Sequence, residues 1–122
     1  MIIGLGIDII EINRIAKAVE KNNRFMGRVF TKKEIDHFKL CNWNISTIAG
    51  SFAAKEAIMK SLGTGLRDFK WTDIEIHRNE LGKPFVLLKN NAKTLAEGQG
   101  ISNIMISISH SREYAIAQAI AT

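Results

Sequence analysis

The sequence contains a single cysteine among its 122 residues. Cys41 therefore cannot form an internal disulfide, and its apolar neighbours indicate a buried thiol rather than a nucleophile. The three histidines are scattered and follow no metal-binding motif, which argues against a zinc site. The absence of an internal disulfide favours a reducing compartment, and we expect the cytoplasm.

Long hydrophobic runs are missing as well. No apolar stretch approaches the roughly 18 residues that a membrane helix needs, so we expect no membrane partner. The apolar start carries Asp8 and Glu11 and lacks both a basic region and a small-residue cleavage site, which makes it a poor signal peptide. There is no internal repeat, low-complexity tract or interdomain linker. With 46% hydrophobic residues, residues 1–122 are expected to form one soluble domain.

Acidic residues are almost absent between positions 14 and 33, where Glu20 is the single exception. The basic residues of this segment are Arg14, Lys17, Lys21, Arg24, Arg28, Lys32 and Lys33. The first five are spaced 3, 4, 3 and 4, so they line one side of a helix unless it breaks at Asn22 and Asn23. Such runs are usually solvated helix faces. The lack of interleaved acids and the net charge of +5 instead favour a docking surface for an anionic partner.

Hydrophobic periodicity predicts an α+β fold, in which antiparallel strands pack on one long helix and shorter helices. The expected elements are a buried strand at 2–10, a helix from about residue 11, a helix opened by a Thr31–Glu34 capping box, a long helix at 45–62 capped by Gly63, a hairpin of two strands within 73–88, a short helix at 91–97, and strands at 103–109 and 114–121. Alternation in the first strand places Asp8 on the face opposite Leu5, Ile7 and Ile9.

Two acids stand in unusually apolar surroundings. A carboxylate inside a strand, as at Asp8, is costly unless it is paired, hydrogen-bonded or bound to a metal. Glu56 lies mid-helix within FAAKEAIMKSLGTG, with Lys60 one turn further on and Lys55 beside it. The simpler interpretations are that Asp8 caps the helix beginning near Glu11 and that Glu56 pairs with Lys60 on the surface. If the two acids instead meet, they offer the oxygen ligands that Mg²⁺ prefers, with phosphate and water completing the shell.

Two further segments carry candidate binding residues. Gly63, Thr64 and Gly65 follow the long helix, and their backbone amides are able to meet a phosphate, although a glycine helix stop needs no ligand. In ISISHSREYAIAQA, alternation places Ser109 on the face of the strand opposite the isoleucines. His110 ends this strand, and it either binds a phosphate or is a turn histidine with its own hydrogen bonds.

Three segments together, GIDIIEI at 6–12, FAAKEAIMKSLGTG at 52–65 and ISISHSREYAIAQA at 106–119, resemble the signature blocks of the holo-acyl-carrier-protein synthase family. Their order and spacing agree with the family, as does GKP at 82–84. The resemblance implies the 4′-phosphopantetheinyl transferase fold and transfer of 4′-phosphopantetheine from coenzyme A to a serine of apo acyl carrier protein, with release of adenosine 3′,5′-bisphosphate. It also implies a homotrimer with active sites between subunits.

The resemblance further implies roles for single residues. Asp8 and Glu56 match the family's Mg²⁺ ligands, with coenzyme A diphosphate and water as the others. Glu56 is then the candidate to accept the serine proton, directly or through a metal-bound water. Lys60 matches a family lysine near the phosphates, which would protonate or electrostatically stabilise the leaving group. The coenzyme A site would be lined by Lys55, Gly63, Thr64, Gly65, Ser109 and His110, with His110 near the 3′-phosphate. The carrier-binding arginines correspond to Arg14, Arg24 and Arg28.

One position departs from the family pattern, because Ser51 stands where members commonly have an arginine that contacts phosphate. Two other classes of function compete with the transferase. A small basic nucleic-acid-binding domain fits the charge, but only Phe25 and Phe30 interleave the basic run, and such a domain gives no reason for the two acids. A non-catalytic subunit that only binds acyl carrier protein requires both acids to be structural. We therefore expect an enzyme with no nucleic-acid partner.

Overall fold

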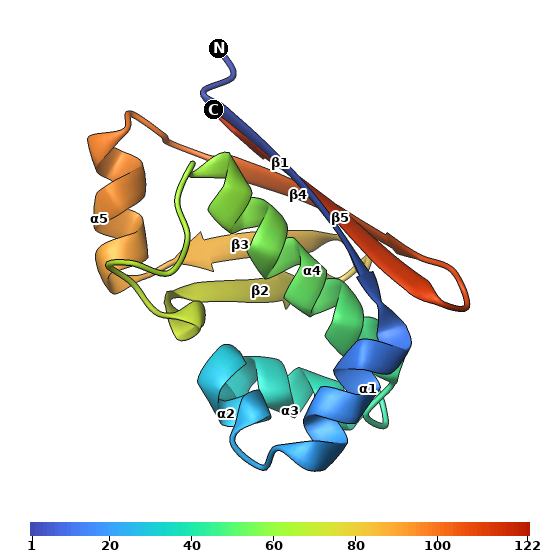
Figure 1. Ribbon diagram of the computed structural model, residues 1–122. Coiled ribbons are helices and arrows are strands. Elements are labelled where there is room, and N and C mark those ends of the chain that lie inside the picture. Colours follow the sequence, from blue (N-terminus) through green and yellow to red (C-terminus); the bar gives the residue numbers. More distant parts are fainter.

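A computed structural model describes residues 1–122. The elements are β1 (Gly4–Glu11), α1 (Ile12–Lys21), α2 (Phe25–Val29), α3 (Lys32–Leu40), α4 (Ile45–Ser61), the short 3₁₀ helix η1 (Trp71–Asp73), β2 (Ile74–Arg78), β3 (Pro84–Leu88), α5 (Asn90–Gly98), β4 (Ile104–His110) and β5 (Tyr114–Ala121). Figure 1 shows α4 lying along the sheet, with α1, α2 and α3 gathered at one end. The α+β prediction is confirmed, while α2 and η1 were not predicted. None of the helices is long and apolar enough to cross a membrane.

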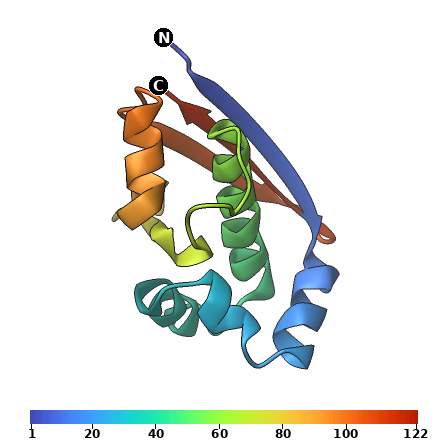
Figure 2. The same ribbon diagram turned by 60° about the vertical axis from the view of Figure 1, so that its left-hand side comes forward.

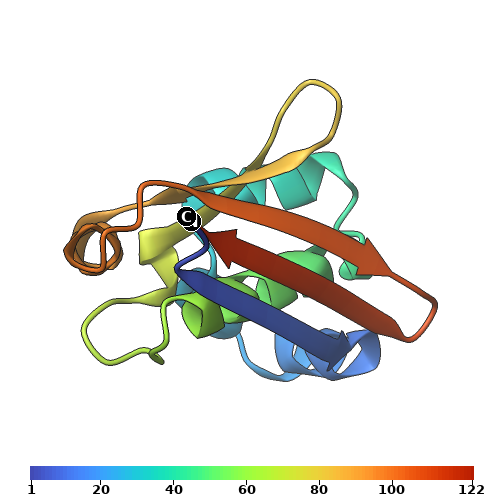
Figure 3. The same cartoon turned by 90° about the horizontal axis from the view of Figure 1, so that it is seen from above.

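The main sheet has three antiparallel strands in the order β1-β5-β4, and β2 and β3 form a separate hairpin. Figure 3 shows the three strands side by side over α4. In the sheet, Asp8 pairs with Ala117, which in turn pairs with Ile108. Gly4 pairs with Ala121, which places the two ends of the chain close together (Figure 2).

Helix α4 is the centre of the core because its small residues let the sheet approach closely. Ala53, Ala54 and Ala57 are fully buried in it. On β1, a Cβ atom added at Gly6 would lie 1.9 Å from the carbonyl oxygen of Ala57. Only glycine permits this contact, which brings the next inward residue of β1, Asp8, up to α4.

The prediction that the first strand is buried is wrong for one of its faces. Leu5, Ile7 and Ile9 are 60%, 56% and 62% exposed, because α4 packs on the opposite face of β1. Met105 of β4 and Ile116 of β5 are also exposed. No helix covers this side of the sheet in Figure 1. We call it the open face of the sheet.

The basic segment does not form one continuous helix. Helix α1 ends at Lys21, and the side chain of Asn22 accepts a hydrogen bond of 2.9 Å from the backbone N–H of Arg24. Asx turns of this kind compete with the helix backbone, so the break falls at the expected asparagines. Arg14 therefore lies on α1, whereas Arg28 lies on α2.

Helix α3 begins as predicted. Thr31 and Glu34 form the capping box, each side chain accepting from the other's backbone N–H. At its C-terminal end Cys41 is half-buried rather than buried, and its Sγ lies 3.7 Å from Nε2 of His37. Glu34 is only 2% exposed, so this cap lies in the interior of the protein.

Candidate functional site

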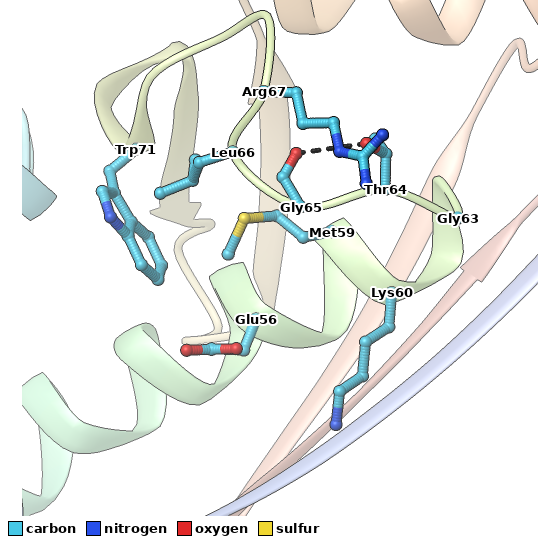
Figure 4. A pocket seen from close by; sticks show the side chains of 9 residues that line it. All are labelled: Glu56, Met59, Lys60, Gly63, Thr64, Gly65, Leu66, Arg67 and Trp71. Atoms are coloured by element: carbon cyan, nitrogen blue, oxygen red, sulfur yellow. Dashed lines mark hydrogen bonds between the residues drawn. The ribbon is translucent and has the colours of Figure 1, made fainter.

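A cavity of about 690 Å³ lies beside the C-terminal half of α4. Its walls are the α4 residues Glu56, Met59 and Lys60, the loop residues Gly63, Thr64, Gly65, Leu66 and Arg67, and Trp71 of η1 (Figure 4). Gly63 adopts φ +75°, a left-handed conformation that glycine accepts readily, and this turn ends α4. The cavity thus brings three predicted site residues of the loop together with Glu56 and Lys60. We call it the loop cavity.

Lys60 reaches from α4 across to β1. Its Nζ donates hydrogen bonds to the carbonyl oxygen of Ile7 at 2.9 Å and to Oδ1 of Asp8 at 3.2 Å. Figure 4 shows the side chain extending toward that strand. Lys60 therefore pairs with Asp8 and not with Glu56. Asp8 also does not cap α1, because the N-cap residue is Glu11, which has no side-chain cap bond. Both simpler interpretations of the acids are wrong.

The negative charge of Asp8 acts on the carboxylate of Glu56. Burial raises the pKa of Glu56, the negative charge of Asp8 raises it further, and the positive charges of Lys60 and Arg14 oppose both. Two carboxylates that repel each other in a partly buried site favour a cation between them. The protein has no group of three or more His, Cys, Asp or Glu residues that could hold a metal. Asp8 and Glu56 thus offer carboxylate oxygens, but two such side chains alone do not complete the ligand shell of a metal ion.

A second cavity, of about 410 Å³, also borders Glu56. Asp8, Arg14, Phe25 and Phe52 are among the residues that line it, and Glu56 contributes to the walls of both cavities. The ring of Phe52 stacks on Trp71 of the loop cavity, with centroids 5.1 Å apart. The two cavities therefore meet at Glu56 and at the stacked rings of Phe52 and Trp71. We call the second cavity the helix cavity.

Lys55 does not line either cavity, contrary to expectation. It is fully buried, and its Nζ donates to the carbonyl oxygens of Val29 at 2.6 Å and Trp71 at 3.2 Å and to Oε1 of Glu34 at 2.7 Å. Burial lowers its pKa, while Glu34 opposes that shift. Successive residues of an α-helix point about 100° apart, so Lys55 turns into the core while Glu56 faces the cavities.

Ser109 and His110 are exposed and lie away from the loop cavity within this chain. Ser109 is on the open face of the sheet, opposite to the face that α4 covers. His110 pairs with Ala115 at one end of the sheet, whereas Gly4, beside the end of α4, lies at the other. The nearest polar contact of the His110 ring is a long one, 3.4 Å to the carbonyl oxygen of Ser111.

The remaining candidates are placed as follows. Arg14, Arg24 and Arg28 are all exposed, and the charge of Arg14 reaches Glu56. Ser51 is only 3% exposed within α4. The sequence interpretation missed Leu66, Arg67 and Trp71 as cavity residues. Their closeness in sequence to the glycine turn at 63–65 was the available signal.

Comparisons with known proteins agree with this geometry. A family model described as "4′-phosphopantetheinyl transferase superfamily" matches residues 4–119. The chain is 60% identical over 121 residues to holo-[acyl-carrier-protein] synthase of Alkaliphilus oremlandii, covering 99% of both chains.

Solved structures agree as well. The holo-[acyl-carrier-protein] synthase of Neisseria meningitidis superposes with a TM-score of 0.91 at 33% identity, covering 100% of this chain and 99% of that one. The Helicobacter pylori enzyme, solved in complex with coenzyme A, gives a TM-score of 0.84 at 34% identity and covers 97% of this chain and 99% of that one. The resemblance seen in the sequence is thus confirmed over nearly the whole chain, which belongs to the 4′-phosphopantetheinyl transferase superfamily.

Proposed function

We propose that the protein is a holo-[acyl-carrier-protein] synthase, which transfers 4′-phosphopantetheine from coenzyme A to a serine of apo acyl carrier protein and releases adenosine 3′,5′-bisphosphate. The observation that carries the proposal is the position of Glu56, which lines the helix cavity together with Asp8 and also lines the loop cavity. Neither a nucleic-acid-binding domain nor a non-catalytic subunit explains two acids in that position. Residues 1–122 would act as one transferase unit in a reducing compartment such as the cytoplasm.

Asp8 and Glu56 are suited to hold a magnesium ion. Their donor atoms are carboxylate oxygens, which Mg²⁺ prefers, and their mutual repulsion would be relieved by a cation. Because Asp8 and Glu56 are the only two acids proposed at this site, the phosphates of coenzyme A and water would fill the remaining coordination positions of the ion. When bound, the ion would neutralise charge on the phosphate under attack.

The side chains themselves would handle the protons. Glu56 borders both cavities, so its carboxylate is suited to accept the serine proton, directly or through a metal-bound water. Lys60 lies on the same face of α4, and its ammonium group would stabilise or protonate the leaving phosphate. In the free protein its contact with Asp8 keeps it at the edge of the loop cavity.

The two cavities would separate the two substrates. Gly63, Thr64 and Gly65 line the loop cavity and would face the coenzyme A diphosphate with their backbone amides. Arg67, in the same wall, adds a positive charge to this proposed site. The helix cavity lies beside Arg14, and Arg14, Arg24 and Arg28 would steer and orient the acidic carrier protein. Contributions of exposed charges of this kind decrease as salt rises.

The active form would be a homotrimer, with each site formed between two subunits. The open face of the sheet exposes Leu5, Ile7 and Ile9, and apolar patches of this kind commonly mark protein interfaces. Ser109 lies on that face and His110 lies at its end. A second copy packed there would supply Ser109 and His110 to the loop cavity of its neighbour, with His110 near the coenzyme A 3′-phosphate.

A mass assay tests the reaction. Purified protein is incubated with coenzyme A, Mg²⁺ and apo acyl carrier protein, and the carrier is followed by mass spectrometry. We expect the carrier to gain one phosphopantetheine group. If folded protein produces no gain, the proposed reaction is wrong.

Subunit mixing tests the shared site. Asp8→Asn and His110→Ala variants would each have low activity alone. Mixed after dissociation and reassociation, they would regain activity, because some sites would combine the intact Asp8 of one subunit with the intact His110 of another. Sites contained within one chain would show no such recovery.

A further inference from the structure

A fully buried ion pair lies behind the loop cavity, and the proposed chemistry does not use it. Lys55 is 0% exposed and Glu34 is 2% exposed, and Nζ of Lys55 lies 2.7 Å from Oε1 of Glu34. Burying two charges is costly, and apolar residues of similar volume often stabilise a fold equally well. No buried side-chain nitrogen or oxygen in the protein lacks a hydrogen-bond partner. The complete satisfaction of this pair indicates a defined geometric role.

Lys55 connects α4 to two segments of the proposed site. Its Nζ donates to the carbonyl oxygen of Val29 at 2.6 Å and to that of Trp71 at 3.2 Å. Val29 is the last residue of α2, which carries the exposed Arg28, while Trp71 forms part of the loop-cavity wall. One ammonium group thus holds the basic helix and the cavity wall against the helix that carries Glu56.

Glu34 extends the connection to α3 and β2. Its Oε1 accepts hydrogen bonds from Nζ of Lys55 and, at 2.9 Å, from the backbone N–H of Thr31. Its Oε2 accepts at 2.9 Å from the backbone N–H of Ile76. The carboxylate therefore fixes the start of α3 to strand β2 of the β2–β3 hairpin. Helix α3 closely follows α2 in the chain.

We propose that Lys55 and Glu34 are positioning residues, which set the distance between the carrier-binding surface at Arg24 and Arg28 and the reacting phosphate beside Glu56. The inference rests on the proposed function. A carrier protein docked on α2 must present its serine at the phosphate in the loop cavity. Hydrogen bonds to two backbone carbonyls fix the distance between α2 and the loop cavity more narrowly than apolar contacts do. A displacement of about 1 Å can reduce a rate about 100-fold.

The test is the double variant Lys55→Met with Glu34→Gln. It removes both charges together, so no unpaired charge stays buried. Gln keeps one oxygen for the Thr31 cap, while the Ile76 N–H loses its acceptor. Lys55→Met alone serves as a second variant. The control is Ile101→Ala, a core substitution distant from the pair that also lowers the melting temperature. For every protein we would measure kcat, KM for apo acyl carrier protein, and Kd for coenzyme A with Mg²⁺, below its melting temperature.

We expect kcat of the double variant to fall about 30- to 100-fold. Its KM for the carrier and its Kd for coenzyme A should both stay within about threefold, because the arginines and the loop cavity remain. The Ile101→Ala control should keep the wild-type kcat despite its lower melting temperature. A loss of stability alone would not lower kcat while leaving KM for the carrier and Kd for coenzyme A nearly unchanged.

Three results would overturn the inference. They are a folded double variant with wild-type kcat, an equal loss of kcat in the control, and failure of both Lys55 variants to fold at any temperature, which would assign the pair to folding alone. Wild-type protein that transfers nothing would instead refute the proposed function, on which this inference depends.

Discussion

Two groups of charged residues lie on different sides of α4. Lys55 belongs to one group and its neighbour Glu56 to the other. Lys55 belongs to a closed network with Glu34, and near it Glu75 of β2 contacts His77 at 2.6 Å and Lys89 at 3.0 Å. Glu56 belongs to the other group, which faces two cavities and contains the partly exposed ion pair of Lys60 with Asp8.

The two groups shift their carboxylates in opposite directions. For Glu75, burial raises the pKa, but hydrogen bonds from Thr31, Lys89 and His77 outweigh it and lower the pKa to about 2. For Glu56, burial and Asp8 raise the pKa, and the charges of Lys60 and Arg14 do not overcome them. A satisfied carboxylate stabilises the fold. An incompletely satisfied one stays available for a metal, a proton or a substrate.

Neutralising the open group should have the largest effect. In Glu56→Gln or Asp8→Asn, a proposed metal ligand is lost, and we expect transfer to fall at least about 1,000-fold. The melting temperature should change little, because relief of the repulsion between the two carboxylates offsets the partly exposed Lys60–Asp8 pair that Asp8→Asn loses. The measurement is the carrier mass assay together with thermal unfolding.

The matched control for this loss is Glu97→Gln on the exposed surface of α5, which should retain full activity. A Glu56→Gln variant with near-normal turnover would remove Glu56 from the metal site. Loss of activity in EDTA and recovery with Mg²⁺ would separate metal dependence from other roles of the two acids.

The close contact that brings Asp8 to α4 should be next in effect. Gly6→Ala would place a Cβ atom 1.9 Å from the Ala57 carbonyl oxygen, so β1 must move away from α4. We expect a loss of about 3 kcal/mol or more of unfolding free energy, with reduced transfer because Asp8 moves with its strand. Chemical denaturation measures the first and the mass assay the second.

Gly27→Ala provides the matched control, because a Cβ atom there meets nothing within 4 Å and the residue lies in α2. It should be neutral or stabilising by up to about 1 kcal/mol. Equal stability losses at both glycines would show that the contact with α4 is not the cause.

Much of this fold could be predicted from periodicity and caps. Strand alternation, the capping box at Thr31 and the glycine stop at Gly63 are local patterns, and the structure contains all three. Helix α2 spans only five residues between loops and has no such signal. The exposure of Ile7 and Ile9 was not predictable, because an apolar face looks the same in sequence whether a core or a partner covers it.

The site was predicted less evenly than the fold. Motif resemblance selected Asp8, Glu56 and Lys60, and the structure brings these three together. It did not separate Lys55 from Glu56, because the partner that draws Lys55 inward, Glu34, lies 21 positions away in sequence. Long-range pairing of this kind leaves no local pattern.

The contribution of the closed network to stability should depend on pH in the acidic range. Because the pKa of Glu75 is about 2 in the folded protein and 4.5 in its reference state, its charge stabilises the fold above pH 4.5. That stabilisation is lost as pH falls from 4.5 toward 2. Glu75→Gln should therefore cost roughly 1 to 3 kcal/mol at pH 6, and the gap from wild type should narrow in acid. Denaturation series at several pH values measure it, and a constant gap would contradict the low pKa.

The smallest expected effect is a titration shift in the open group. In metal-free protein without coenzyme A, NMR should find the pKa of Glu56 above its ordinary value. Asp8→Asn removes a repelling charge and should lower the pKa of Glu56, although not fully, because burial is the larger cause. Glu75 should titrate alike in both proteins. If the pKa of Glu56 is the same in wild type and Asp8→Asn, the two carboxylates do not share one site.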